Sequence, residues 1–190
     1  MSMRRSKQIS VTVLSILSLG LGWYVNAHPN LYTRISPALP SGSYRVVSFS
    51  DGDTIKVDMN GKTETIRFIG VDTPETHDPR KVVQCFGLAA AAYTKQLIGE
   101  SPVRLEADPL STNRDKYDRL LRYIYLPDGR LVQAELIKNG YGFAYTSFPF
   151  TKSEEFSNYQ TEARQAGRGL WHDCTPETNK YGGFTSNPAP

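Results

Sequence analysis

Asn60-Gly61 stands between two runs of residues that favour β-strands. Asn-Gly is typical of a two-residue hairpin turn, because both turn positions need a left-handed backbone. Before it, residues 54–59 alternate between polar and apolar side chains. After it, residues 63–71 return as the partner strand. The pattern predicts a β-hairpin whose two far ends lie side by side.

The rest of the central region predicts more strands and several helices. We expect further strands over 44–49, 103–107 and 120–126, and helices over 87–98, 132–139 and 151–166. A glycine follows each predicted helix, and Thr151 with Glu154 fits a capping box at the start of the last one. Five short strands with three interspersed helices predict an α+β domain. A small, partly closed barrel would bury a sheet of this size.

The N-terminal residues 1–27 are typical of an export signal or a membrane anchor. Arg4, Arg5 and Lys7 precede an apolar stretch, and small residues around Ala27 suit cleavage. Three alternatives remain open: a cleaved signal, a retained anchor and a buried core helix. Either export route predicts a protein that is secreted or held on the external face of the membrane. Contact with the membrane would then occur only through an uncleaved segment.

The remaining boundaries follow from composition. Residues 28–43 are rich in Pro and Ser and predict a linker, 44–172 the folded domain, and 173–190 a disordered tail. We expect a monomer. The three N-terminal cations account for the formal charge of +3, so the other residues carry 19 Lys and Arg against 19 Asp and Glu. Binding to a polyanion must therefore come from local clusters of cations.

The two cysteines are Cys85 and Cys174. Outside the cytoplasm such a pair is usually oxidised. A bridge between them would close a long loop and contribute roughly 4–5 kcal/mol by loop entropy. The alternative is two free, buried thiols, and neither cysteine has the spacing of a zinc ligand.

Asp53 and Asp72 are the candidate metal ligands, because the predicted hairpin makes them neighbours. Two adjacent carboxylates repel each other unless a cation lies between them. Carboxylates with a backbone carbonyl, here that of Thr73, form an oxygen set that suits Ca²⁺ or Mg²⁺ rather than zinc. Taken alone, Asp51-Gly52-Asp53 is more typical of a solvated turn.

Arg67 and Arg119 are candidate phosphate ligands that flank this cation. The planar guanidinium makes two parallel hydrogen bonds to phosphate. Glu75 follows in the same turn as Asp72, where a carboxylate can take a proton from water. Taken singly, each arginine is more typical of a surface ion pair, and Glu75 of a solvated acid.

Four segments resemble the staphylococcal nuclease (thermonuclease) family. They are Asp51-Gly-Asp-Thr, Arg67-Phe-Ile-Gly-Val-Asp-Thr-Pro-Glu-Thr, Asp115-Lys-Tyr-Asp-Arg119 and Gly169-Leu-Trp171. Their order and separations agree with the family over about residues 44–171. The resemblance implies an OB-fold barrel with three helices. It also implies a Ca²⁺-dependent endonuclease that hydrolyses DNA and RNA and leaves 3′-phosphates.

The resemblance also implies roles for single residues. The metal ligands would be Asp53, Asp72 and Thr73, the catalytic residues Arg67, Glu75 and Arg119, and the nucleotide-lining residues Tyr117 and Tyr145. Asp51 would lie behind the metal ligands.

Asp118 departs from the family, whose best-known member has Gly there. We expect Asp to tolerate a positive φ at this turn. The rival hypothesis is a non-catalytic OB-type module that binds nucleic acid or protein. Survival of all three catalytic side chains favours the enzyme.

Overall fold

The computed structural model describes residues 39–76, 82–180 and 182–189. The predicted export segment lies outside these residues, as does most of the predicted linker. Within the described ranges, we find no helix with the length and apolar character needed to cross a membrane.

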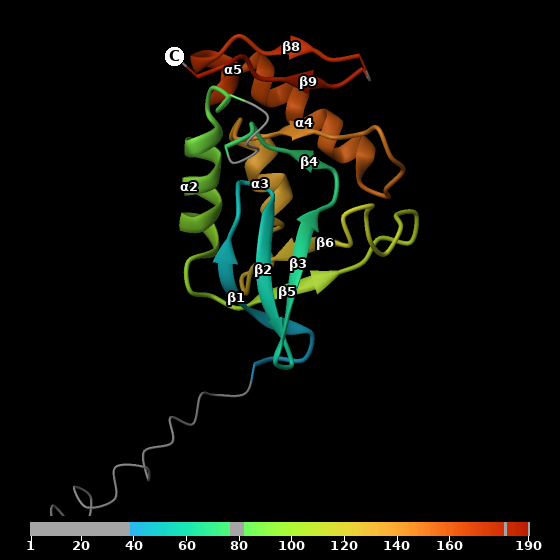
Figure 1. The fold of residues 1–190 in the computed structure, drawn as a ribbon. Helices are drawn as coiled ribbons and strands as arrows, with labels where there is room; N and C mark the ends of the chain where they lie inside the picture. Colours follow the sequence, from blue (N-terminus) through green and yellow to red (C-terminus); the bar gives the residue numbers. More distant parts are fainter. Residues whose placement is uncertain (1–38, 77–81, 181, 190) are drawn as a thin grey trace, which may run out of the picture. The chain divides into compact units, whose positions relative to one another are not determined.

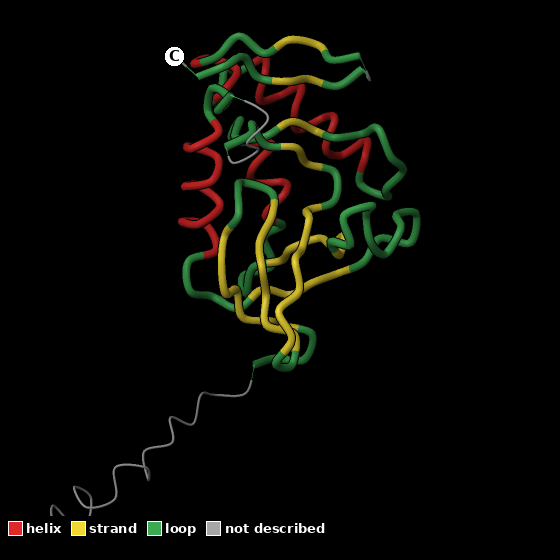
Figure 2. Tube along the Cα trace, in the orientation of Figure 1, coloured by secondary structure: helices red, strands yellow, loops and turns green. Residues whose placement is uncertain are grey.

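Five strands close into the predicted barrel (Figures 1 and 2). They are β1 (Ser43–Phe49), β2 (Thr54–Met59), β3 (Lys62–Phe68), β5 (Val103–Glu106) and β6 (Leu120–Tyr125). Their order around the barrel is β1-β2-β3-β6-β5, and β5 pairs with β1. Only β3 and β6 run parallel among these pairs, with Arg67 opposite Leu121.

The β2–β3 hairpin confirms the prediction from Asn60-Gly61. Both turn residues have positive φ, 58° and 86°, and the register runs from Thr54 opposite Arg67 to the turn. Alternate side chains of the two strands point inward and are fully buried: Ile55, Val57, Ile66 and Phe68. Their burial leaves Arg67 on the outer face, because neighbouring strand residues point to opposite sides.

The described residues also form four helices. They are α2 (Gly87–Ile98), α3 (Val132–Lys138), α4 (Ser153–Gln165) and α5 (Leu170–Asp173), of which α5 was not predicted. The predicted capping box is wrong, because no side chain caps α4. The N–H and hydroxyl of Thr151 both donate to Oδ2 of Asp108 instead. The N-cap position of α4 is occupied by Lys152 rather than Thr151, and the Asp108 carboxylate joins the chain before α4 to the loop after β5.

The strand predicted over 63–71 divides in two. It leaves the barrel at Gly70, where φ is +74° and a Cβ would lie 2.6 Å from the ring of Phe150. Beyond that break β4 (Val71–Asp72) pairs with β7 (Phe143–Ala144). The break turns the chain toward α4 and carries the predicted ligand Asp72 with it.

The C-terminal residues differ from the predicted disordered tail. β8 (Glu177–Thr178) and β9 (Phe184–Thr185) form an antiparallel pair. Cys174 is bonded to Cys85, with 6.0 Å between their Cα atoms. Phe184 packs edge-on against Trp171, with ring centres 5.1 Å apart. A polar composition misled the prediction, because a covalent link and backbone pairing hold this segment.

Candidate active site

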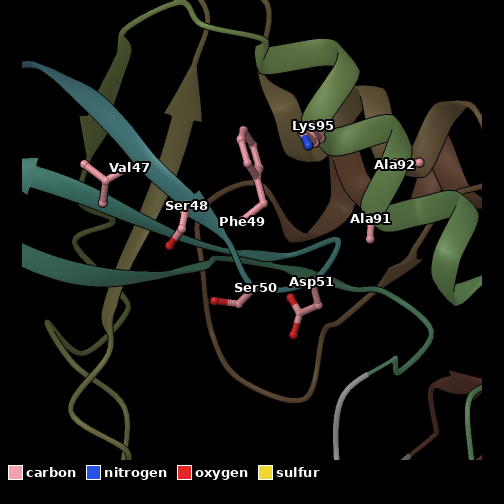
Figure 3. Close-up of a pocket in the computed structure, with 8 residues that line it drawn as sticks. All are labelled: Val47, Ser48, Phe49, Ser50, Asp51, Ala91, Ala92 and Lys95. Carbon is pink, nitrogen blue, oxygen red and sulfur yellow. The ribbon is translucent and has the colours of Figure 1, made fainter.

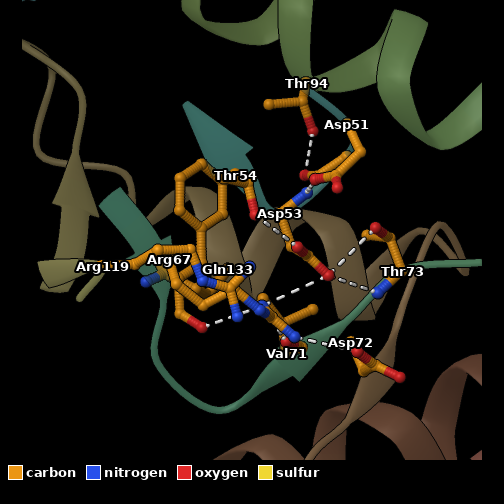
Figure 4. A network of polar contacts seen from close by, with 12 residues as sticks. Asp51, Asp53, Thr54, Arg67, Val71, Asp72, Thr73, Thr94, Arg119 and Gln133 are labelled. Carbon is orange, nitrogen blue, oxygen red and sulfur yellow. Dashed lines mark hydrogen bonds and ion pairs between the residues drawn. The ribbon is translucent and has the colours of Figure 1, made fainter. Parts of the chain in front are cut away.

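Arg67 lies at the centre of a charged cluster at the end of β3 (Figure 4). Its side chain is only 12% exposed. Nη1 donates to the carbonyl oxygens of Phe68 at 3.1 Å and Val71 at 2.7 Å. Nη2 donates to Oδ1 of Asp72 at 2.8 Å, and Nη1 lies 3.2 Å from Oδ2 of Asp53. The guanidinium is thus fixed by backbone and by carboxylates together.

Asp53 is held in the cluster from several sides. Its Oδ2 accepts from the N–H of Thr73 at 2.8 Å and from the Thr73 hydroxyl at 3.1 Å. Its Oδ1 accepts from the hydroxyl of Thr54 at 3.0 Å. The hairpin and the break at Gly70 therefore act together to bring Asp53, Asp72 and Thr73 close to one another, as predicted from the sequence. The two carboxylates contact one shared guanidinium.

The electrostatics of the cluster are dominated by carboxylates. Burial opposes the charge of Arg67, but Asp53 and Asp72 outweigh it and raise the Arg67 pKa above its ordinary value. Burial raises the pKa of Asp51 to about 7, and the charge of Asp53 adds to that shift. When all three carboxylates are ionised, the group of four side chains is net negative.

Asp51 borders a pocket between the end of β1 and α2 (Figure 3). Its Oδ1 accepts from the N–H of Asp53 at 3.1 Å. Phe49, Ala91 and Lys95 line the same pocket. Asp51 is the one member of the charged cluster among its lining residues, so the pocket is a neighbour of the cluster rather than its centre.

Arg119 lies just before β6 and is bound by Asp115. Its Nε and Nη2 both lie 2.7 Å from Oδ2 of Asp115, and its backbone N–H donates to Oδ1 at 3.0 Å. Burial opposes ionisation of Asp115, but these hydrogen bonds prevail and lower its pKa. Asp118 in the same turn has φ +64°, so it adopts the left-handed backbone that we expected this residue type to tolerate. Because Arg67 pairs with Leu121, the register places both arginines at neighbouring strand ends.

Glu75 lies three residues beyond Asp72, in the turn that follows β4. Its N–H donates to Oε1 of Gln84 at 2.7 Å, and its carbonyl accepts from the N–H of Gln84 at 2.9 Å. One of its carboxylate oxygens accepts from the N–H of Thr76 at 3.0 Å. The backbone of this candidate base is therefore fixed by Gln84.

The two candidate nucleotide-lining tyrosines lie on different loops. Tyr117 is 63% exposed, and the Arg119 guanidinium lies 5.4 Å from its ring centre. The N–H of Tyr145 donates to the carbonyl of Gly70 at 2.9 Å, beside the break after β3. The Tyr145 phenol is close enough to influence the pKa of Arg67. Each tyrosine thus accompanies one of the two arginines.

The residues fit a calcium ion by the chemistry of their donors. Asp53, Asp72 and the Thr73 carbonyl offer oxygen only, and a divalent cation would offset the negative charge around Arg67. Within residues 39–76, 82–180 and 182–189, no cluster of three or more acidic, histidine or cysteine side chains has metal-binding spacing. A site here would therefore rest on two carboxylates with backbone and water oxygens.

Sequence reasoning missed two supporting residues. Asp115 was part of a recognised segment but had no assigned role, although an acid four residues before an arginine in a turn is a usable signal. Gln84 gave no such signal, because it meets Glu75 only through the folded chain.

A closed five-stranded barrel in the order β1-β2-β3-β6-β5, with two arginines at neighbouring strand ends, fits a domain of the OB type. The profile described as "Staphylococcal nuclease homologue" matches residues 65–173. The chain is 33% identical over 162 residues to a thermonuclease of Staphylococcus hyicus, covering 85% of this chain and 94% of that one. The chain therefore belongs to the staphylococcal nuclease family.

Two Bacillus subtilis proteins are also similar. Endonuclease YncB is 42% identical over 132 residues, or 68% of this chain and 62% of that one. The SPbeta prophage-derived endonuclease YokF is 42% identical over 123 residues, or 64% of this chain. The matches span less than two thirds of these two relatives, 62% and 41% of their lengths.

Proposed function

We propose that this chain is a Ca²⁺-dependent nuclease that hydrolyses phosphodiester bonds of DNA and RNA. The observation that carries the proposal is the Arg67 cluster, in which two carboxylates meet one buried guanidinium beside the turn that holds Glu75. Similarity to a thermonuclease and to two endonucleases supports it. The family resemblance further suggests internal cleavage with 3′-phosphate products.

Asp53, Asp72 and the Thr73 carbonyl would hold the metal ion. When bound, Ca²⁺ supplies a Lewis acid for a non-bridging phosphate oxygen. The ordered hydrogen bonds from Thr73 and Thr54 fix the Asp53 carboxylate before any ligand arrives. Such preorganisation lowers the cost of binding.

The side chains of the site account for the remaining chemistry. Glu75 accepts a proton from water as the water oxygen bonds to phosphorus, and the bond from phosphorus to the 5′ oxygen breaks. The leaving oxygen takes a proton from solvent. Arg67 and Arg119 donate hydrogen bonds to phosphate oxygens, whose negative charge grows toward the transition state. Interactions that strengthen in this way raise turnover.

We also propose that the protein works outside the cytoplasm. The cationic and then apolar start of the chain supports export, and the Cys85–Cys174 disulfide suits an oxidising compartment. Cell fractionation tests this, and a protein found only in the cytoplasmic fraction contradicts it.

The function is tested by assaying the full chain on single-stranded DNA, double-stranded DNA and RNA. Each substrate is incubated with Ca²⁺, with Mg²⁺ and with a chelator. We expect cleavage with Ca²⁺ and loss of cleavage in the chelator. Asp53→Ala should abolish both the activity and its response to Ca²⁺, because a ligand is lost.

Glu75→Gln is the matched control for contaminating nucleases. It keeps the size of the side chain but cannot accept the proton at neutral pH, so turnover should fall by roughly 10²–10⁴-fold. Cleavage that persists in the chelator contradicts the metal dependence. A wild-type chain that cleaves none of the three substrates would favour a non-catalytic binding module instead.

A further inference from the structure

Residues 84–87 lie between Glu75 and the C-terminal segment, defined here as residues 174–180 and 182–189. On one side Gln84 forms hydrogen bonds with both the backbone N–H and the backbone carbonyl of Glu75. Gln84 accepts from the Glu75 N–H through its side chain and donates to the Glu75 carbonyl through its backbone. A shift of Gln84 would therefore move Glu75.

Gly87 tightens the same contact from the start of α2. A Cβ at this position would lie 2.9 Å from the carbonyl oxygen of Glu75 and 2.8 Å from Cγ2 of Thr76. Such separations leave no room for a side chain. The backbones of residues 84–87 and of the Glu75 turn are thus packed directly together.

The other side of residues 84–87 is held by the C-terminal segment. Nε2 of Gln84 donates to Oγ1 of Thr185 and to the carbonyl of Ser186, both at 3.1 Å. The buried hydroxyl of Ser186 donates to the carbonyl of Cys85 at 3.0 Å, and the Cys85 N–H donates to the carbonyl of Asn187 at 2.8 Å. The disulfide to Cys174 adds a covalent link.

We propose that Gln84 is a positioning residue for Glu75 and that the C-terminal segment fixes its orientation. The inference rests on the proposed function, in which Glu75 is the base. The two acceptors on the C-terminal side hold the amide nitrogen, so the amide oxygen faces the Glu75 N–H. A base must lie within hydrogen-bond reach of the attacking water, and a misplacement of about 1 Å can cost on the order of 100-fold in rate.

Gln84→Met and Ser186→Ala test the link from its two ends. Methionine has a similar length but cannot form the amide hydrogen bonds. We expect Gln84→Met to lower kcat by roughly 10–100-fold and to leave KM within about 3-fold, since phosphate binding by the arginines is untouched. Ser186→Ala should lower kcat by a smaller factor, roughly 3–10-fold, because the other contacts of the segment remain.

Ser157→Ala is the matched control. Its hydroxyl also donates to a backbone carbonyl, that of Ser153 at 2.8 Å, but within α4. It should leave kcat within about 2-fold of the wild type, since it removes a similar bond without touching Glu75. If the loss of any hydrogen bond lowered activity, kcat would fall equally in Ser186→Ala and Ser157→Ala. Equal effects would therefore overturn the proposal.

Hydrogen exchange of the Glu75 amide supplies a readout that does not depend on catalysis. The amide should exchange faster in Gln84→Met and in Ser186→Ala, and at the wild-type rate in Ser157→Ala. An active wild type whose two test variants keep both kcat and exchange rate overturns the inference. So does a fall in kcat without faster exchange. A wild type that cleaves nothing refutes the proposed function, while the exchange data still decide the link. If Gln84→Met does not fold, Ser186→Ala carries the test.

Discussion

Arg67 and Arg119 belong to the same proposed site, but they are held in different ways. Arg67 is 12% exposed and is bound by two backbone carbonyls and two carboxylates. Arg119 is 28% exposed and is bound by the single carboxylate of Asp115. The first belongs to the end of the barrel, and the second to the loop between β5 and β6.

The difference separates two tasks within one site. The more buried arginine is part of the structure, because it balances the carboxylate of Asp53, which is 7% exposed and would otherwise lack a counter-charge. The loop arginine can change partners at lower cost, because it gives up one partly exposed ion pair. In the proposed site the barrel end would supply a fixed frame, and the loop would supply a group that moves from Asp115 to a phosphate.

The largest expected effect separates the two arginines directly. Arg67→Ala should abolish measurable turnover and destabilise the fold by about 3–5 kcal/mol, because Asp53 loses its buried partner. Arg119→Ala should lower turnover by roughly 10²–10³-fold with less than about 1 kcal/mol lost in stability. Nuclease assays of both variants measure the turnover, and urea unfolding measures the free energy of unfolding. Equal losses of stability would break the comparison.

The next effect concerns Asp108, which anchors the loop between β5 and β6 to Thr151. Asp108 is 5% exposed and accepts hydrogen bonds from Thr151 and Tyr123. Burial acts to raise its pKa, but these bonds outweigh it and lower the pKa from 3.8 to about 2. The folded state therefore binds this proton less readily than the unfolded state. Stability from this group is present above about pH 4 and disappears as the pH falls toward 2.

Unfolding free energies of the wild type and of Asp108→Asn, measured between pH 5 and 2, test this anchor. The asparagine cannot ionise, so the stability gap between the two proteins should shrink by about 1–2 kcal/mol over that range, allowing for solvent screening. A gap that stays constant with pH would show that the charge of Asp108 contributes nothing to anchoring the loop.

The smallest effect concerns Asp118, which has φ +64° beside Arg119. Asp118→Gly should change stability by less than about 1 kcal/mol, because relief of the left-handed backbone is offset by greater freedom when unfolded. It should tighten nucleotide binding by roughly 2–5-fold, since an exposed acid next to the phosphate ligand is removed. Fluorescence titration with a nucleotide measures this. Asp118→Asn removes the charge alone, and wild-type affinity in both variants would exclude an electrostatic role.

Much of the barrel was predictable because its signals are local. Asn60-Gly61 fixed the turn, and the alternation on both sides of it fixed which residues of β2 and β3 are buried. The same hairpin predicted that Asp53 and Asp72 would lie close together, although the break at Gly70 that turns the chain before Asp72 was not predicted. These features depend on residues that are neighbours in the sequence or across one turn.

The features that were missed depend on contacts between distant residues. Thr151 has the sequence of a helix cap, but Lys152 occupies the N-cap position and Thr151 donates to Asp108 instead. The C-terminal segment has the composition of a disordered tail, but Cys85 and Gln84 give it partners about a hundred residues away. No local sequence pattern predicts such distant partners. They become visible only when the whole chain is folded.

The parallel pairing of β3 with β6 has a consequence for how this domain can vary among related sequences. Arg67 and Arg119 reach one end of the barrel through the register of those two strands, with Arg67 opposite Leu121. The chain that joins the strands is constrained as well, because it contains Asp72, Glu75, Cys85 and the barrel strand β5. A slip of one residue between the two strands would turn one arginine to the opposite face, so changes of chain length among related sequences should leave this register intact.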